Sequence, residues 1–185
     1  IPGLVGSEMC IRDSFKTDTS VVQIEENLYE GNLSDRWSIG KTPNGGYTMA
    51  LAAKAISESL NHNDPLAITA NYLNRLNFGK VLVTVEVLPF TKSLSSARAT
   101  MLQDDEIKVI FTATFTDFLK TKGLNKSFRR EPAFVDYEDC IFHPFKEGFN
   151  PGLEKFIEKR YCPDSVWWEE KKKGKPNKAT LNLYM

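Results

Sequence analysis

The stretch that decides the fold is Trp37-Ser-Ile-Gly-Lys-Thr-Pro-Asn-Gly-Gly-Tyr47, and an alanine-rich run follows it as far as Leu60. Pro43 to Gly46 form a concentrated turn signal. From Tyr47 to Leu60 the chain contains neither glycine nor proline. Within this run the apolar residues recur at helical spacing, at Met49, Ala52, Ala53, Ile56 and Leu60. We therefore expect a glycine turn that leads into the N-terminus of one buried helix.

The start of this helix is a candidate binding site. A helix N-terminus presents backbone N–H groups without helical partners and the positive end of the helix dipole. The segment Asn44-Gly45-Gly46-Tyr47 can therefore bind an oxyanion or polarise a carbonyl group. The alternative is that the glycines only let the chain turn sharply into a core helix. The residues alone leave both interpretations open.

Composition excludes several classes of function. The 185 residues include 24 basic and 24 acidic side chains, so no net field favours nucleic acid or an anionic membrane. No apolar run approaches the roughly 20 residues of a membrane-spanning helix. The three cysteines (Cys10, Cys140 and Cys162) are far apart, and with only two histidines neither a zinc site nor a disulfide scaffold is expected. We expect a cytoplasmic protein without a metal.

Strand-like patterns surround the helix. Residues 20–29 predict a strand, and residues 32–35 a loop. After Asn61-His-Asn-Asp-Pro65 ends the helix, four β-rich runs follow closely, at Leu66–Leu76, Lys80–Phe90, Leu94–Leu102 and Glu106–Leu119. Their short connections permit only antiparallel pairing. The prediction is an α+β domain in which one helix faces one antiparallel sheet.

The alternation within two of these runs predicts which side chains face the helix. Val81, Val83, Val85 and Val87 share one face of their strand. In the last run the corresponding set is Ile107, Val109, Phe111, Ala113 and Phe115. Such period-two patterns are typical of strands with one buried face.

The two ends of the chain differ from its centre. Residues 1–14 resemble translated sequencing-adapter sequence, and we expect them to be a non-native leader. Residues 121–150 begin with a basic, polar stretch and predict a linker. Further strands are expected at Leu153–Tyr161, Val166–Lys172 and Ala179–Met185, with a charged hairpin tip over residues 171–178. Because the last of these patterns is still apolar at Met185, we expect an incomplete second domain over residues 151–185.

In this order the elements resemble the acyl-CoA thioesterase II-like superfamily of double-hotdog proteins. The resemblance covers residues 20–118 and rests on four blocks in register. They are Trp37–Ala55, Asp64–Leu73, Gly79–Val87, and Ser96–Thr100 with the continuation through Gln103 to Thr112–Phe115.

The resemblance implies two hotdog repeats, each a curved antiparallel sheet wrapped around a long helix. Residues 15–120 correspond to the first repeat and residues 151–185 to the truncated start of the second. It also implies hydrolysis of fatty acyl-CoA to free acid and CoA without a cofactor, and a homo-oligomer formed through the hotdog sheets. The family's catalytic Asp, with its Thr and Gln partners, belongs to the second repeat. No residue here matches these positions, so the catalytic residues are unknown.

The expected substrate-binding residues are Asn44, Gly45, Gly46, Tyr47 and Gln103, although Gln103 equally suits a hairpin end. Other polar residues are weaker candidates. Asp35, His62 and His143 lie in predicted loops, where solvated side chains are the rule. Ser95 and Ser96 have no neighbouring His–Asp signature and no G-x-S-x-G motif, so a serine hydrolase is not indicated.

Two alternative functions remain open. The first is a non-catalytic hotdog domain that binds acyl groups or serves as a scaffold. The second is an enoyl-CoA hydratase-type hotdog protein, which the absence of an Asp-x-x-x-x-His pattern at the helix start disfavours.

Overall fold

The computed structural model describes residues 14–123, 126, 135–163 and 183–184. The chain divides into two compact units, Ile1–Gly123 and Leu124–Met185. The expected leader, apart from Ser14, lies outside the described residues. So do the expected strand at 166–172 and the hairpin tip at 171–178.

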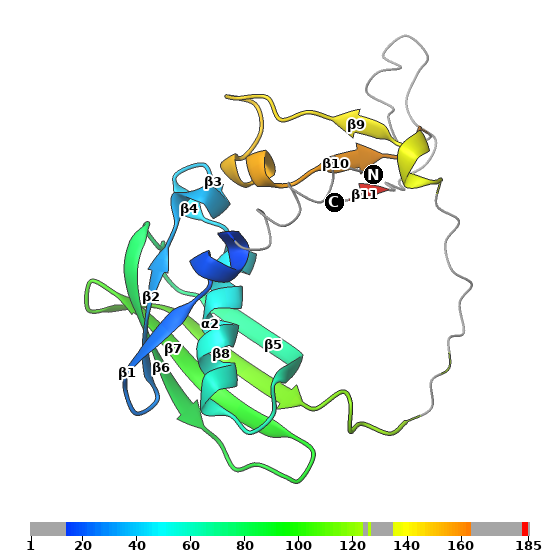
Figure 1. Cartoon of the computed structure of the whole chain (residues 1–185). Coiled ribbons are helices and arrows are strands. Elements are labelled where there is room, and N and C mark those ends of the chain that lie inside the picture. Colours follow the sequence, from blue (N-terminus) through cyan, green and yellow to red (C-terminus); the bar gives the residue numbers. More distant parts are fainter. Residues whose placement is uncertain (1–13, 124–125, 127–134, 164–182, 185) are drawn as a thin grey trace. The chain divides into compact units, whose positions relative to one another are not determined.

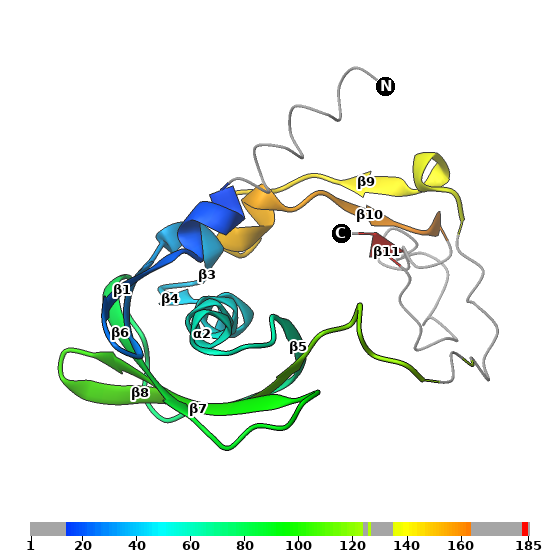
Figure 2. The same cartoon turned by 60° about the horizontal axis from the view of Figure 1, so that its bottom comes forward.

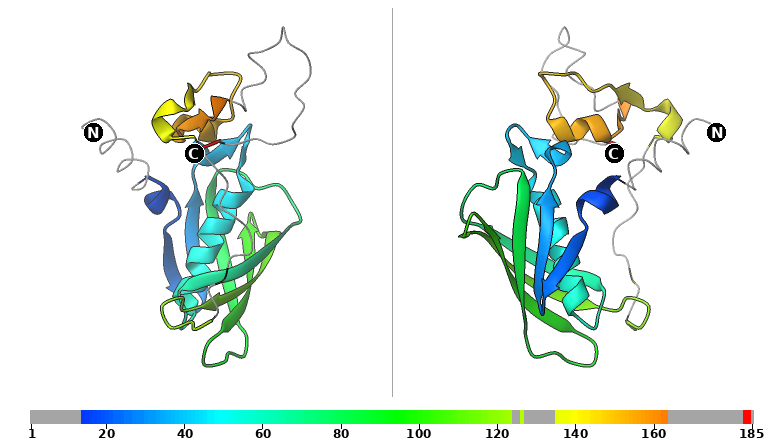
Figure 3. Two further views of the ribbon diagram at one scale, coloured as in Figure 1. Left: turned by 90° about the vertical axis from the view of Figure 1, so that its right-hand side faces the viewer. Right: turned by 60° about the vertical axis from the view of Figure 1, so that its left-hand side comes forward.

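The first unit is a six-stranded antiparallel sheet that curls around a single long helix (Figures 1 and 2). This confirms the predicted α+β hotdog architecture. The helix, α2, spans Gly45–Ser59 and runs along the concave side of the sheet (Figure 3). The strands, in their order across the sheet, are β1 (Val21–Glu25), β2 (Leu28–Leu33), β6 (Gly79–Val87), β7 (Ser95–Gln103), β8 (Glu106–Thr116) and β5 (Asp64–Tyr72).

The helix packs on the sheet through small residues and one leucine. Leu51, Ala52 and Ala55 have no exposed surface. Gly31 on β2 allows the close approach, because a Cβ there would lie 2.9 Å from both Leu51 Cδ atoms. The alanines thus bring helix and strands together, as a close-packed core requires.

The buried face of α2 differs from the predicted one. Ala52 and Ile56 are buried as expected, whereas Met49, Ala53 and Leu60 are only half-buried. The buried set is Tyr47, Thr48, Leu51, Ala52, Ala55 and Ile56. Because the alanine-rich run carries apolar residues on several sides, its spacing leaves the direction of the buried face ambiguous by one residue.

The predicted single strand over residues 20–29 is wrong. The chain forms two strands, β1 and β2, joined at Asn27, which has a φ of 57°. A left-handed residue suits asparagine and reverses the chain without glycine or proline. The second strand, β2, continues to Leu33, so Asn32 lies in a strand and not in the predicted loop.

The alternation within β6 and β8 is largely confirmed. Val81, Val83 and Val85 are buried, whereas Val87 at the strand end is 40% exposed. In β8 the predicted Ile107 is exposed, because the register with β7 shifts between Met101 and Leu102. This irregularity places Lys108 beside Val109 on the buried side.

Strand β5 lies at an edge of the sheet and, among the described strands, pairs with β8 alone. It ends at Tyr72, four residues earlier than predicted. The carbonyl oxygen of Lys108 then accepts hydrogen bonds from the backbone N–H groups of Leu73 (2.9 Å) and Asn74 (3.2 Å). These bonds fix the segment after Tyr72, which lines the candidate site described below.

A short segment connects β2 to the helix. A 3₁₀ turn, η1, spans Asp35–Trp37, and the strands β3 (Ser38–Ile39) and β4 (Thr42–Pro43) form a two-stranded ribbon. It delivers the chain to Asn44, immediately before α2.

In the second unit, β9 (Ile141–His143), β10 (Lys159–Tyr161) and β11 (Leu183–Tyr184) form a three-stranded antiparallel sheet. The strand expected at Leu153–Tyr161 is confirmed only at its end, because 3₁₀ turn η3 occupies Gly152–Phe156. Strand β9, preceded by the 3₁₀ turn η2 (Tyr137–Asp139), lies inside the stretch expected as a linker.

Within the described ranges, no helix has both the length and the apolar character to cross a bilayer. The same residues contain no cluster of three or more His, Cys, Asp or Glu side chains arranged to hold a metal ion.

Candidate functional site

The turn before α2 is held by the side chain of Asn44. Its Oδ1 accepts the backbone N–H groups of Gly46 (2.8 Å) and Tyr47 (3.2 Å), and its carbonyl oxygen accepts that of Thr48 (3.0 Å). Asn44 is therefore an N-cap. Two of the donors that the sequence offers for an oxyanion are bound internally. Of the first-turn N–H groups, that of Gly45 is the one that Asn44 does not bind.

Tyr47 is a structural tie between the helix start and the sheet. Its hydroxyl accepts the N–H of Ser34 (3.0 Å) and donates to the carbonyl oxygen of Asp18 (2.8 Å). Its ring packs against Trp37 and Phe15. Burial raises the pKa of this phenol. The side chain is 3% exposed and does not line the cavity described next.

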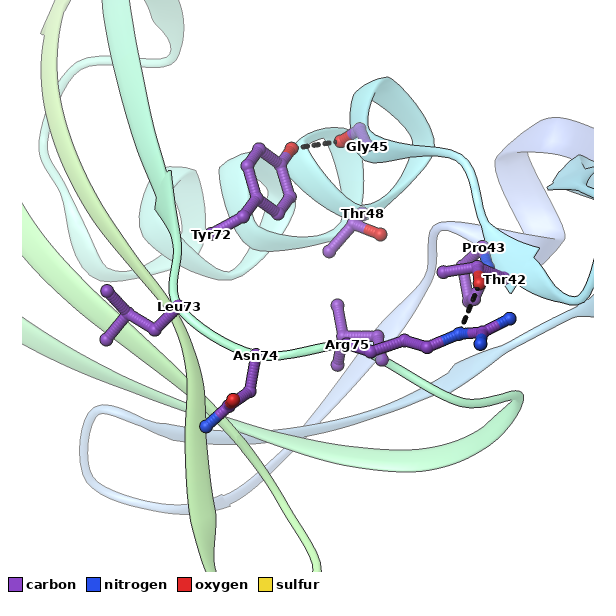
Figure 4. Close-up of a pocket in the computed structure, with 9 residues that line it drawn as sticks. Thr42, Pro43, Gly45, Thr48, Tyr72, Leu73, Asn74 and Arg75 are labelled. Carbon is purple, nitrogen blue, oxygen red and sulfur yellow. Dashed lines mark hydrogen bonds between the residues drawn. The ribbon is translucent and has the colours of Figure 1, made fainter.

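A cavity of about 470 Å³ opens beside the first turn of α2 (Figure 4). Its volume lies within the range of small-molecule sites. Strand β4, the helix start and the end of β5 all contribute to its wall. The lining residues are Thr42, Pro43, Gly45, Thr48, Tyr72, Leu73, Asn74, Arg75 and Leu76.

Tyr72 reaches from the edge strand to the helix start (Figure 4). Its hydroxyl donates a 2.6 Å hydrogen bond to the carbonyl oxygen of Gly45. A Cβ at Gly45 would lie 3.0 Å from this hydroxyl oxygen, so a side chain there would displace the tyrosine. Partial burial raises the pKa of the Tyr72 phenol. Gly45 therefore leaves room for the Tyr72 hydroxyl, and Gly46 donates its N–H to the Asn44 cap in the first turn.

Arg75 supplies the positive charge of this cavity. Its Nε donates to the Thr42 hydroxyl at 2.7 Å, which orients the guanidinium (Figure 4). Among the described residues Arg75 takes part in no ion pair. A guanidinium whose Nε is already fixed still offers both terminal nitrogens to a carboxylate or phosphate. The cavity thus combines a neutral wall with one oriented cation.

Among the described residues, those that line this cavity include no carboxylate and no imidazole. They offer the Gly45 N–H, hydroxyl groups, an amide and a guanidinium, all of which can bind or polarise a substrate. None of these groups is suited to accept a proton near neutral pH. This cavity can therefore position a substrate, but its wall supplies no general base.

Of the five residues expected to bind substrate, the structure gathers four at the helix start, and Gly45 alone lines the cavity. Gln103 lies elsewhere. Its amide accepts the Asn77 N–H (2.8 Å) and donates to the carbonyl oxygens of Asn77 (3.1 Å) and Lys80 (3.2 Å). It is 6% exposed and ties the loop before β6 to the β7–β8 hairpin. Asp104 and Asp105, with φ of 55° and 60°, form the turn of that hairpin.

Sequence reasoning missed both Tyr72 and Arg75 as site residues. Both fall inside the strand-like run predicted at Leu66–Leu76, which gave neither of them a role in a site. The resemblance block that ends at Leu73 indicates the neighbourhood but not the side chains. Their meeting with Gly45 and Thr42 depends on the strand order, which places the end of β5 beside the start of α2.

The structure also brings together His62 and Ser95, which are 33 positions apart. His62 Nδ1 lies 2.7 Å from Ser95 Oγ, and Nε2 lies 3.3 Å from the carbonyl oxygen of Lys92. The serine is 1% exposed, so its hydroxyl faces the interior. The pair therefore fastens a loop and does not present a nucleophile. His143 belongs to the second unit, where its ring packs against Tyr161.

Comparison with known proteins places this geometry in context. Residues 33–116 match the family model of the acyl-CoA thioesterase N-terminal domain. A thioesterase-like protein from Talaromyces wortmannii is 33% identical over 92 residues, which are 48% of this chain and 26% of that protein. The matched region thus spans about a quarter of the length of this curated relative.

Solved structures show the same fold at low sequence identity. One from Thermobifida fusca, provisionally assigned as a thioesterase II, has a TM-score of 0.76 at 19% identity, over 83% of this chain and 57% of that one. An acyl-CoA thioesterase II from Mycobacterium marinum has a TM-score of 0.64 at 16% identity, over 91% and 58% of the two chains. A hot dog protein of unknown function from Alicyclobacillus acidocaldarius reaches 0.70 at 19%, over 80% and 55%. At these identities the likeness establishes the fold alone.

Proposed function

We propose that this chain, a thioesterase-like hotdog protein, is part of an enzyme that hydrolyses the thioester of fatty acyl-CoA to a free acid and CoA. The observation that carries the proposal is the cavity at the start of α2, which Gly45 and Arg75 both line. The match of residues 33–116 to an acyl-CoA thioesterase domain supports the substrate class.

In this proposal the helix start polarises the thioester. Attack of water on the carbonyl carbon places negative charge on the carbonyl oxygen. A backbone N–H at a helix N-terminus stabilises such charge, and loss of one donor of this kind typically costs about 3–4 kcal/mol. The Tyr72 hydroxyl donates to the carbonyl oxygen of the same residue, Gly45, and this hydrogen bond helps to fix the first turn.

Arg75 is proposed to recognise the CoA portion. The phosphates of CoA carry several negative charges, and a guanidinium binds phosphate through two parallel hydrogen bonds. The bond from Nε to Thr42 leaves the terminal nitrogens for this contact. Arg75 would thereby align the thioester with Gly45.

The general base must come from outside the cavity wall, because none of its lining residues can serve. The resemblance to double-hotdog enzymes puts that base in a second repeat of the intact protein. We therefore expect this chain by itself to bind acyl-CoA and to show weak or no turnover.

A second candidate function is acyl-CoA binding without hydrolysis. The same absence of a carboxylate or imidazole from the cavity wall favours it. In that case the hotdog domain would hold the acyl-CoA for another protein or serve as a scaffold.

The decisive experiment is release of free thiol from decanoyl-CoA by the intact gene product. We expect cleavage by the intact protein and saturable binding of acyl-CoA to this chain. Arg75→Gln should weaken CoA binding about tenfold, the usual scale for a lost charged hydrogen bond. Arg98→Gln is the matched control, since Arg98 lies on β7 and pairs only weakly with Glu86 at 4.0 Å.

The outcomes separate the candidates. Binding without cleavage, across several acyl chain lengths, would establish the second function and overturn the first. No binding to this chain would overturn both assignments of the cavity.

Association through the sheet edge is also proposed. The end of strand β5 and the residue that follows it are exposed, with Tyr72 at 48% and Leu73 at 55%. An edge strand with apolar side chains favours pairing with another chain. Light scattering should show an oligomer, and a monomer at all concentrations would exclude this assembly.

A further inference from the structure

A second cavity, of about 520 Å³, lies at the opposite end of α2 within the first unit. Its wall comes from the loop after the helix, the start of β5, the β6–β7 loop and the turn after β8. These segments meet because β5 returns antiparallel to α2 and pairs with β8. The residues assigned to acyl-CoA binding above do not line it.

Positive charge dominates the polar part of this wall. Lys92, Lys120 and Lys122 line the cavity, and Asp117 is the one carboxylate among its described lining residues. Asp117 is occupied by Lys120, at 2.6 Å, and this contact lowers the pKa of the carboxyl group. Lys92 and Lys122 form no ion pair within the part of the chain that the structure describes. The wall thus has an excess of two positive charges.

Apolar side chains lie beside these lysines. Leu66 and Phe118 are each 55% exposed, and Leu94 is 38% exposed, although all three line the cavity. Exposed side chains of this size gain free energy when a ligand removes them from water, at roughly 25 cal/mol per Å² of apolar surface. Cations next to hydrated apolar surface match a ligand with an anionic head and an apolar chain.

The loops that carry the wall are fixed by hydrogen bonds. The Thr116 hydroxyl donates to the carbonyl oxygen of Ser93 at 2.9 Å. The Asp64 carboxylate accepts the Phe118 N–H at 2.7 Å. Because a carbonyl oxygen only accepts, His62 Nε2 donates to Lys92, and in the neutral ring Nδ1 then accepts from Ser95. The cavity is therefore preformed. Lys92 belongs to the β6–β7 loop, and Lys120 and Lys122 belong to the segment after β8, and these hydrogen bonds fix both segments.

We propose that this cavity binds a fatty-acid carboxylate. The carboxylate lies between Lys92 and Lys122, and the alkyl chain covers Leu66, Leu94 and Phe118. The inference is independent of the proposed hydrolysis. If both hold, the free acid released from acyl-CoA has its own site on the same domain, separate from the cavity at the helix start.

The test is a calorimetric titration of the full chain with decanoate. Decanol supplies the chain without the charge, and inorganic phosphate supplies an anion without the chain. We expect saturable binding of decanoate and at least about tenfold weaker binding of the other two, since each lacks one half of the recognition.

Two pairs of variants locate the site. Lys92→Gln/Lys122→Gln removes two charges from the wall, and Lys54→Gln/Lys80→Gln removes the same number from exposed positions that do not line it. Phe118→Ser shortens the apolar wall, whereas Leu119→Ser changes a neighbour that is 98% exposed. We expect the first member of each pair to weaken decanoate binding about tenfold and its control to leave it unchanged.

Circular dichroism verifies that each variant is folded before titration. Decanoate affinity that is unchanged in both wall variants would overturn the proposal, as would binding lost only in Arg75→Gln, which would move the acid to the other cavity. Phosphate binding as tight as decanoate would also overturn it, because the apolar wall would then contribute nothing. Thioester cleavage does not enter this titration, so its presence or absence leaves the result intact.

Discussion

The two ends of α2 solve opposite problems with the same helix. At its N-terminus most polar groups of the turn are bound, by Asn44, Tyr47 and Tyr72, and the Gly45 N–H and the Arg75 guanidinium remain for a ligand. Beyond its C-terminus Lys92, Lys120 and Lys122 line the second cavity, and of these Lys120 alone forms an ion pair with a described residue. The N-terminal end is held mainly by hydrogen bonds, whereas the cavity beyond the C-terminal end carries mainly positive charge. Neutral hydrogen bonds fix geometry at short range, whereas charge attracts a ligand without fixing its pose.

The largest effect is expected from Leu51→Ala, which attacks the core between the two ends. Leu51 has no exposed surface and packs against Gly31. Truncation should lower the free energy of unfolding by about 2–5 kcal/mol, through lost burial and a residual cavity. Urea denaturation measures it. Met49→Ala is the control, because Met49 is only half-buried and should cost less. Equal losses would mean that the helix does not pack through its Leu51 face.

Tyr47→Phe should destabilise the N-terminal end by about 1–3 kcal/mol, because it leaves the Ser34 N–H without its acceptor. The matched variant at the other end is Tyr29→Phe. The Tyr29 hydroxyl lies 2.9 Å from the Ser59 hydroxyl, which can donate its one hydrogen to the Ala55 carbonyl oxygen, 3.2 Å away, when Tyr29 is replaced. We expect a smaller loss there, measured by thermal unfolding. A larger loss of stability for Tyr29→Phe would mean that the hydroxyl at the C-terminal end of α2, and not Tyr47, contributes more to stability.

Alkaline pH provides a second measurement on Tyr47. Burial raises its pKa, so its contribution is present below the ordinary tyrosine value of 10.0 and is lost as the pH rises through the higher folded value. The stability gap between the natural protein and Tyr47→Phe should therefore narrow above about pH 10. A gap that widens would show that the phenolate is tolerated in this site.

Asn44→Ala should cost about 1 kcal/mol, since it removes the cap from the Gly46 and Tyr47 N–H groups. Asn44→Asp keeps an acceptor and adds a charge that the helix dipole favours, so it should retain the stability. Chemical denaturation of the two variants separates capping from side-chain volume. If alanine is as stable as aspartate, the cap contributes nothing here.

The smallest effect is expected at the charged end. Lys120 lowers the pKa of Asp117, so this pair contributes above the ordinary aspartate value and its contribution is lost as the pH falls through the lowered one. Because the Lys120 side chain is 85% exposed, solvent screens this ion pair, and Asp117→Asn should change the free energy of unfolding only slightly at neutral pH. The small difference should vanish in strong acid. A difference that grows with acidity would place the carboxylate in another interaction.

Hydrophobic periodicity and turn chemistry predicted the helix, the four strands that follow it in the chain and their antiparallel pairing. Local patterns suffice for these elements because each strand of the β6–β7–β8 meander pairs with its neighbour in sequence. The same patterns failed at Asn27, where one left-handed asparagine makes a hairpin turn without glycine or proline. They also misjudged the buried face of α2, where alanines occur all around the helix.

Local sequence patterns could not predict which side chains meet at the two cavities. Tyr72 meets Gly45 from 27 positions away, and His62 meets Ser95 from 33. These contacts depend on β5 crossing to the far edge of the sheet, which no local pattern encodes. The Asn44 cap was within reach, because an asparagine before two glycines and a helix is a local signal.

The edge position of β5 also has a consequence for the order of folding. Thr116, the partner of Asp64 on β8, lies 52 positions after it, and two complete strands, β6 and β7, lie between β5 and β8. The chain loses conformational entropy when it closes this long loop, and it does so before the strand pairing contributes any stability. Contacts between residues far apart in the sequence therefore slow folding. During synthesis β5 leaves the ribosome well before β8 exists to pair with it. The strand that closes both cavities therefore cannot pair before β8 has been made, so neither ligand site exists until then.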